Sequence, residues 1–148
     1  MKNNTENIAE LSEYLGLKKL AQQYQQYIQQ AHEKQLGFQE FLQVILQEES
    51  IRKRECNIRY RIEKSRLPCP YKLLDDFDFS FQPTLRKSLI MDLATMDFIK
   101  NKESLLMIGL NGTGKSHLAQ ALGMIACEKG YKVSHSATLL RAQSKLPA

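Results

Sequence analysis

Apolar residues recur at helical spacing through the first third of the chain, and polar faces separate them. A short stripe over Ile8–Leu15 predicts a helix that ends at Gly16, and a longer stripe predicts a second helix over residues 17–36. The polar face of this second helix is rich in glutamine, a good helix former, so we interpret it as a solvated face. A third stripe starts at Phe38 and fades after Leu46. This predicts a long helix that continues beyond a small helical core.

After this helix the pattern changes to short apolar runs that alternate with helical stripes. Pro68 and Pro70 end the long helix, and residues 67–83 are predicted to form a linker. The elements expected next are, in order, a helix from Pro83 to about Ile99, a strand over Ser104–Ile108, a helix over His117–Lys129, a strand over Tyr131–His135 and a helix over Ala137–Lys145 capped by Ser136. Alternating strands and helices call for a parallel sheet.

The linker contains three phenylalanines in alternation with polar residues, in the segment Asp75–Phe81. Such a pattern is typical of half-buried extended chain. We interpret the segment as a strap that packs on the following domain. The alternative is an apolar wall for a nucleotide base.

The sequence between the first predicted strand and the next helix matches the phosphate-binding P-loop, G-x-x-x-x-G-K-[ST]. Glycines allow backbone conformations that other residues avoid, so successive N–H groups can face an anion, and the helix that follows adds its partial positive charge. The alternative is a glycine-rich turn that happens to precede Lys-Ser. The strand before and the helix after favour the P-loop. The predicted nucleotide-binding residues are Gly109, Leu110, Asn111, Gly112, Thr113, Gly114, Lys115, Ser116 and His117.

Within this loop the side chains have distinct expected roles. Lys115 supplies a positive charge for the β- and γ-phosphates, and the hydroxyl of Ser116 is offered to Mg²⁺ that the nucleotide brings. His117 could approach the nucleotide, although no chemistry requires it. The predicted cofactors are therefore ATP and Mg²⁺. We assign no catalytic residue.

The distal part of the long predicted helix is basic and includes Tyr60. A surface of this kind can contact the phosphate backbone of DNA without reading its sequence. The alternative is an ordinary solvated helix face. The candidate DNA-contacting residues are Arg52, Lys53, Arg54, Arg59, Arg61, Lys64 and Arg66.

Composition narrows the class of protein. The 148 residues are 43% hydrophobic and 25% charged, with a formal net charge of +5, which is ordinary for a globular protein. No apolar run approaches the roughly 20 residues that span a bilayer, and the polar N-terminus lacks a signal core, so we expect a cytoplasmic protein without membrane contact. The three cysteines are widely spaced and predict free thiols rather than a metal site or disulfides.

The order of these features resembles a known family. A helical N-terminal module precedes Asp76–Pro83, then Asp92–Ile99, and then the P-loop with its Lys-Ser-His-Leu-Ala continuation. This is similar to the IstB-like helper ATPases of bacterial insertion sequences, which are relatives of the DnaC helicase loader in the AAA+ class. The resemblance implies ATP binding, oligomers on DNA and a partner transposase. A DnaC-like loader fragment, or a DNA- or partner-binding fragment without ATPase activity, are the alternatives.

The resemblance also implies parts that this sequence does not contain. A Walker B strand, a polar sensor and an arginine for a neighbouring subunit would follow the second strand, and the sequence ends at Ala148. Asp92 and Asp97 precede the P-loop and cannot replace the Walker B acids. We therefore expect a truncated form with little ATP hydrolysis.

The expected fold class is α/β. We predict an all-helical module with the basic helix over residues 1–66, the linker over 67–83, and the incomplete parallel sheet of a P-loop domain over 84–148. In the AAA+ strand order, two other strands separate Leu105–Ile108 from Lys132–His135. We therefore expect the helical module to fold, and the segments beyond about Ser104 to be loosely held or paired with non-native partners.

Overall fold

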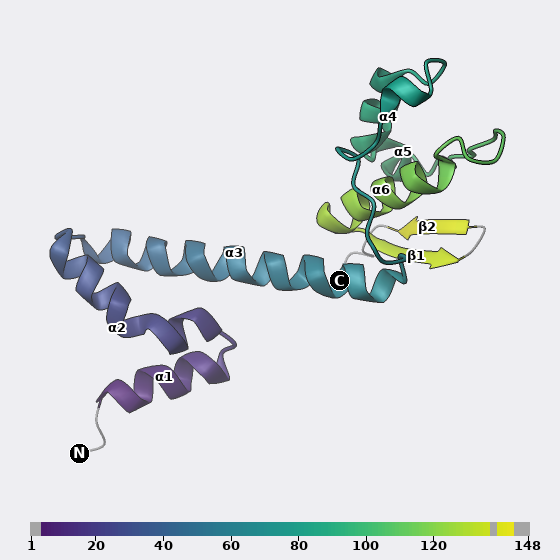
Figure 1. The fold of residues 1–148 in the computed structure, drawn as a ribbon. Coiled ribbons are helices and arrows are strands. Elements are labelled where there is room, and N and C mark those ends of the chain that lie inside the picture. The colour runs from purple at the N-terminus through teal and green to yellow at the C-terminus, as the bar shows by residue number, and fades with distance from the viewer. Residues whose placement is uncertain (1–3, 137–138, 144–148) are drawn as a thin grey trace. The chain divides into compact units, whose positions relative to one another are not determined.

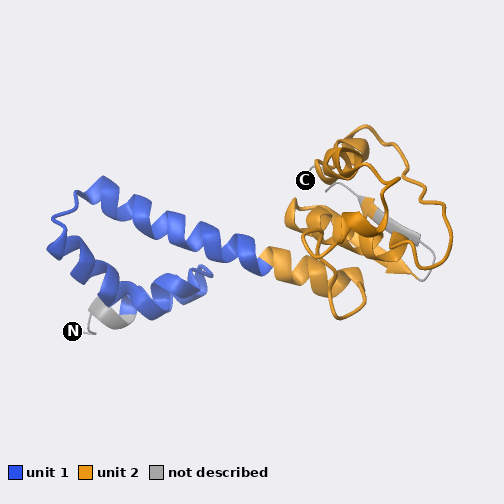
Figure 2. Ribbon diagram, turned by 45° about the horizontal axis from the view of Figure 1, so that its top comes forward, with its two compact units in different colours: residues 1–56 blue, residues 57–148 orange. Residues whose placement is uncertain are grey.

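The structure is a computed structural model that describes residues 4–136 and 139–143. It divides into two compact units, residues 1–56 and residues 57–148 (Figure 2). The long helix α3, Phe38–Ser65, contributes its first part to unit 1 and its last part to unit 2. The division therefore follows packing and does not coincide with the end of a helix.

Unit 1 contains α1, Asn4–Tyr14, α2, Lys18–Glu33, and the first part of α3 (Figure 1). These helices occupy the three segments for which helices were predicted. Gly16 separates α1 from α2 with a φ of 75°, in the left-handed region that favours glycine. Among the side chains that the structure describes in this unit, the buried apolar ones are Tyr27 and Ile45.

A buried carboxylate joins the helices of unit 1. Oε1 of Glu49 accepts a hydrogen bond from the backbone N–H of Leu20 at 2.8 Å, and Oε2 accepts one from Nε of Arg52 at 2.6 Å. Nη2 of Arg52 donates to the carbonyl of Gly16 at 2.7 Å. Burial alone would raise the pKa of Glu49, but the hydrogen bonds from Leu20 and Arg52 bring this pKa below its ordinary value of 4.5. Glu49 is therefore ionised in the folded unit near neutral pH.

Unit 2 is built around α6, Lys115–Glu128, which contacts α4, Lys87–Ala94, and both strands (Figure 1). The strands are β1, Lys132–Ser136, and β2, Leu139–Gln143. Helix α5, Asp97–Lys100, and a short 3₁₀ turn, Phe79–Phe81, complete the described elements. The buried apolar cluster consists of Met96, Leu122, Ala126, Cys127 and Val133.

The predicted helix from Pro83 to Ile99 is wrong in its continuity, because Met96 interrupts it. Met96 has a φ of 65° and is only 1% exposed. Its neighbour Thr95 donates its hydroxyl to the carbonyl of Asp92 at 2.7 Å, which satisfies the end of α4. Asp97 then starts α5 and pairs with Lys100 at 2.6 Å. The turn directs the Met96 side chain into the core, so tertiary packing outweighs helical periodicity here.

The predicted parallel sheet is wrong for the described residues. The segment predicted as the first strand, Ser104–Ile108, has no strand pairing, and Leu106 and Ile108 are 79% and 85% exposed. The second predicted strand is present as β1, and it pairs antiparallel with β2 in the register Lys132↔Gln143 to Ser136↔Leu139. The expectation that the segments beyond about Ser104 are loosely held or paired with non-native partners stays a prediction. A hairpin partner lies nearby in sequence, so the loop that joins the two strands costs little entropy to close.

The predicted final helix is also wrong where it can be compared. Residues Leu139–Gln143 form β2 instead. The remaining residues of that prediction, 137, 138, 144 and 145, lie outside the described residues. Ser136 is the last residue of β1 and not a helix cap.

Candidate nucleotide-binding site

The phosphate loop, defined here as Gly109–Ser116, leads directly into α6. Gly112 and Gly114 have φ values of 79° and 81°, in the left-handed region. Gly114 is the N-cap of α6, so Lys115 and Ser116 are the first residues of the helix. The loop thus has its glycines where left-handed backbone is needed, and the helix starts where an anion would gain from its dipole.

The side chain of Lys115 folds back on the loop. Its Nζ donates to the carbonyl of Leu110 at 2.5 Å and to Oγ1 of Thr113 at 3.2 Å. Thr113 in turn donates its hydroxyl to the same carbonyl at 2.9 Å. Lys115 is half-buried, whereas Asn111, Gly112 and Ser116 are exposed. These three hydrogen bonds close the loop around the ammonium group, and its oxygen partners are of the kind that a phosphate oxygen could replace.

The strap, defined here as residues 73–81, packs on the loop and on the first turn of α6. A Cβ on Gly114 would lie 2.5 Å from Cε2 of Phe77, so the ring occupies space that only a glycine leaves open. The ring of Phe77 meets those of His117 and Phe79 edge to face, at centroid distances of 5.2 and 4.9 Å. Phe81, by contrast, is 70% exposed.

A polar contact reinforces this packing. Nε2 of His117 lies 2.8 Å from the carbonyl oxygen of Leu73. Asp78 caps the 3₁₀ turn by accepting from the hydroxyl of Ser80 at 2.6 Å and from its N–H at 2.9 Å, and these hydrogen bonds lower the pKa of Asp78. The sequence indicated a packed strap through its alternating phenylalanines. It gave no signal that Phe77 would lie against Gly114, because that contact joins residues far apart in the chain.

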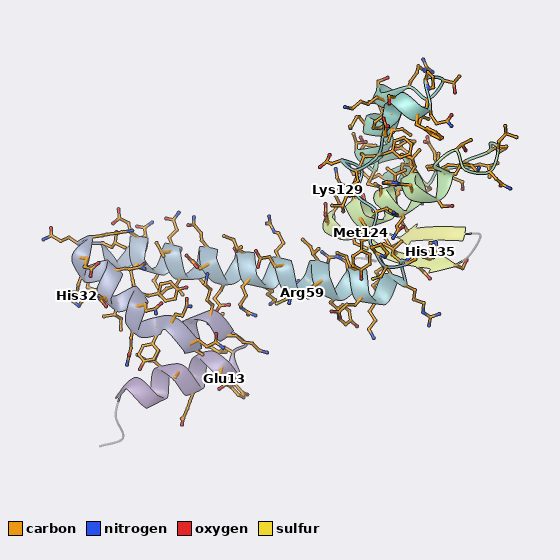
Figure 3. All side chains as sticks on the ribbon, in the orientation of Figure 1. Glu13, His32, Arg59, Met124, Lys129 and His135 are labelled. Atoms are coloured by element: carbon orange, nitrogen blue, oxygen red, sulfur yellow. The ribbon has the colours of Figure 1, made fainter. Side chains whose placement is uncertain are left out.

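The seven candidate DNA-contacting residues fall into two groups. Arg52 and Arg61 are half-buried and make hydrogen bonds inside their own units. Arg52 bonds Glu49 and Gly16 as described above, and Nε of Arg61 donates to the carbonyl of Cys127 in the last turn of α6 at 2.7 Å. The other five side chains are exposed on α3 or just after it, as Figure 3 illustrates for Arg59: Lys53, Arg54, Arg59, Lys64 and Arg66.

The described residues hold no group of three His, Cys, Asp or Glu side chains that could bind a metal ion. Cys56 and Cys69 are exposed free thiols, and Cys127 is a buried one whose pKa is raised by burial. In the part of the chain that the structure describes, no helix is both long and apolar enough to cross a membrane.

A glycine loop that opens a helix, with Lys115 and Ser116 in the first turn, defines the class of P-loop nucleotide-binding proteins. Within this class, the chain belongs to the family of IstB-like ATP binding proteins, whose family model matches residues 9–144. The family expected from the sequence is thereby confirmed.

Curated relatives agree with this assignment. The chain is 33% identical over 137 residues to an ATP-binding protein of insertion sequence IS21 from Pseudomonas aeruginosa, covering 88% of this chain and 51% of the relative. It is 36% identical over 127 residues to the corresponding protein of IS5376 from Geobacillus stearothermophilus, covering 86% and 50%. A protein of IS232 from Bacillus thuringiensis is 34% identical over 129 residues, covering 87% and 51%. The chain spans about half the length of the curated relatives it matches.

Proposed function

We propose that this chain binds ATP with Mg²⁺ through the phosphate loop and His117. The observation that carries the proposal is the start of α6 at Lys115, directly after two glycines in the left-handed region. Backbone N–H groups at this end of the helix have no helical acceptor, and a phosphate supplies one. The curated relatives named as ATP-binding proteins support the choice of nucleotide.

Lys115 and Ser116 fit the bound group. The ammonium of Lys115 is held by two neutral oxygens, those of Leu110 and Thr113, and charged phosphate oxygens would be stronger partners. The exposed hydroxyl of Ser116 lies in the first helical turn, where it would complete the coordination of a Mg²⁺ ion bound to the nucleotide. The metal would neutralise phosphate charge, and these residues would hold and orient the phosphates.

We propose further that this chain hydrolyses ATP slowly or not at all. Phosphoryl transfer depends on positioning a water and on completing the metal site with an acidic residue. Among the described residues, no Asp or Glu is hydrogen-bonded to a side chain of the phosphate loop. Asp92 and Asp97 precede the loop, and Asp97 is engaged by Thr95 and Lys100.

The biological role that we propose is that of a cytoplasmic helper in DNA transposition. The chain would contact the DNA backbone through the exposed basic side chains of α3, associate with the transposase of its insertion sequence, and form oligomers with its own kind. Relatives named for insertion sequences support this role over that of a helicase loader. A DNA- or partner-binding protein without ATPase activity is consistent with slow hydrolysis and with the same contacts.

Titration with a fluorescent ATP analogue tests the nucleotide site. Lys115→Ala removes the side-chain cation of the loop, and we expect at least about a tenfold loss of affinity, which corresponds to 1.4 kcal/mol. Lys132→Ala, which removes an exposed lysine of β1, is the matched control and should bind as the unmodified chain does. Equal affinities for all three proteins would contradict the assignment.

The DNA contacts are tested by the salt dependence of binding to two duplexes of unrelated sequence. Replacing Lys53, Arg54, Arg59, Lys64 and Arg66 with glutamine should weaken both complexes equally. The slope of log K against log salt should fall by about 0.9 for each lost phosphate contact. Replacing Lys18, Lys34, Lys72, Lys102 and Lys132 with glutamine changes the net charge equally and is the control. An effect as large in the control would show that net charge alone drives binding.

A further inference from the structure

The two left-handed glycines of the phosphate loop differ in their surroundings. A Cβ added at Gly112 would meet nothing within 4 Å, whereas a Cβ added at Gly114 would lie 2.5 Å from Cε2 and 3.0 Å from Cζ of Phe77. Both positions have nearly the same φ, 79° and 81°. The backbone therefore explains glycine at both positions, and Phe77 gives a second reason at Gly114 alone.

The strap also forms a hydrogen bond with His117, in the first turn of the helix. The imidazole of His117 lies against the edge of Phe77, with an interplanar angle of 90°, while its Nε2 reaches the carbonyl of Leu73 at 2.8 Å. The ring of Phe79 meets Phe77 edge to face, and Nζ of Lys87 lies over the Phe79 ring, 5.5 Å from its centroid. Two side chains thus connect the strap to the helical turn that carries Lys115 and Ser116.

We propose that Phe77 and His117 are positioning residues for the phosphate site. Phe77 holds Gly114 in the conformation that starts α6, and His117 fixes the strap over that turn. Phosphate binding requires the N–H groups of this turn to keep one direction, so the affinity for phosphates depends on the strap. The proposal deepens the nucleotide-binding function proposed above and rests on it.

The first experiment compares the affinities for ATP and for inorganic pyrophosphate, the latter measured by competition against the fluorescent ATP analogue. Phe77→Ala should weaken both by about tenfold, or 1.4 kcal/mol. Phe77→Leu retains an apolar side chain against Gly114 and should recover most of that loss. Phe81→Ala removes an exposed ring of the same strap and should leave both affinities unchanged. A loss for ATP without a loss for pyrophosphate would mean that Phe77 contacts the base, and would overturn the positioning role.

The second experiment needs no nucleotide. Hydrogen exchange of the full chain should show faster exchange in peptides over 112–118 for Phe77→Ala and for His117→Ala, with unchanged protection in the second half of α6. A general loss of protection would mean that both residues serve only stability, and would overturn the proposal. Unchanged exchange over 112–118 in both variants would also overturn it.

Glycine substitutions provide a matched pair for the same contact. Gly112→Ala and Gly114→Ala carry the same left-handed strain, but only Gly114→Ala also collides with Phe77. Exchange over 112–118 should therefore increase more in Gly114→Ala than in Gly112→Ala. When Phe77→Leu is added to each variant, the difference in exchange between Gly114→Ala and Gly112→Ala should become smaller. The same difference with and without Phe77 would contradict a role for this contact.

These outcomes separate the inference from the function on which it rests. If the unmodified chain binds neither ATP nor pyrophosphate, the proposed function fails, while the exchange measurements still decide whether the strap fixes the loop. If the chain binds nucleotide and the Phe77 variants bind equally well, the proposed function stands and the positioning role falls.

Discussion

The two units differ in what fills their interiors. In unit 1 the buried side chains are the polar Glu49 and Ser12 and the apolar Tyr27 and Ile45, among those that the structure describes. In unit 2 Ser65 and Gln120 are also buried, but most of the buried side chains described there are apolar, and α6 contributes Leu122 to a cluster of them. The stability of unit 1 should therefore respond to the loss of charge and of hydrogen bonds. That of unit 2 should respond to the loss of volume.

The same comparison applies on the two sides of the phosphate loop. The apolar residues Leu106 and Ile108 precede it and are largely exposed, whereas Leu118 and Leu122 follow it and are buried. These four side chains are alike in hydrophobicity, so their burial depends on whether another element packs against them. Met107, between Leu106 and Ile108, does pack against the core cluster, so the loop is held from its helical side, from the strap and through this one residue of the segment before it.

The largest effect is expected from a cavity in unit 2. Leu122→Ala should lower the free energy of unfolding of this unit by about 3 kcal/mol, because it removes methyl groups from a closed apolar cluster. Ile108→Ala removes an exposed side chain of similar size and should change it by less than about 0.5 kcal/mol. Urea unfolding followed by hydrogen exchange in α6 measures both. Similar losses would mean that Ile108 is packed as well.

The next effect concerns the buried carboxylate of unit 1. Glu49→Ala leaves the N–H of Leu20 and the Nε of Arg52 without their acceptor, and should destabilise this unit by about 2 kcal/mol. Glu48→Ala breaks a partly exposed ion pair with Lys19 and should destabilise the unit much less, because solvent screens an exposed pair. Urea unfolding followed by exchange in α2 distinguishes them. A larger destabilisation by Glu48→Ala than by Glu49→Ala would contradict the central role of Glu49.

A smaller effect is expected at the end of α6. Arg61→Ala removes the donor to the Cys127 carbonyl and should destabilise unit 2 by about 1.5 kcal/mol. Arg59→Ala, two residues earlier and exposed, should change stability by less than about 0.5 kcal/mol. Thermal unfolding of both variants sharpens the division of the basic residues into structural and exposed groups. Equal losses of stability in the two variants would contradict that division.

The smallest effect is the response of unit 1 to acid. The pKa of Glu49 is lowered in the folded state, so the unfolded chain binds the proton more readily, and the contribution of Glu49 is present above its ordinary pKa of 4.5. This contribution is lost as the pH falls through the lower, folded pKa. Unfolding free energies of unit 1 measured from pH 6 to pH 3 should therefore decrease, and Glu49→Gln should flatten the curve. The same slope in Glu49→Gln would assign it to other carboxylates.

Much of the helical structure could be predicted because its signals are local. The stripe from Phe38 and the breaks at Gly16 and Pro68 mark helix ends through nearby backbone chemistry, and the phosphate loop is a continuous motif. The hairpin of β1 and β2 could not be predicted in this way. Strand pairing depends on which segments meet, and the sequence of β1 is equally suited to a parallel or an antiparallel neighbour.

The candidate site was predictable to a similar degree. The roles of Lys115 and Ser116 follow from their place in the motif. The positions of Phe77 against Gly114 and of Arg61 on the Cys127 carbonyl join residues more than thirty positions apart, and no periodic pattern encodes them. A basic residue also looks the same in sequence whether it faces solvent or, like Arg52, holds a carbonyl of its own unit.

Met96 shows how one backbone angle can narrow the choice of amino acid. Its left-handed backbone favours glycine, while its buried side chain fills space that glycine would leave empty. Valine and isoleucine would supply volume, but their branched Cβ is disfavoured at a positive φ. Asparagine would accept the angle but would bring an amide into an apolar cluster. An unbranched apolar side chain meets both demands, so a library of substitutions at this position should return a short set of survivors in which methionine and leucine predominate.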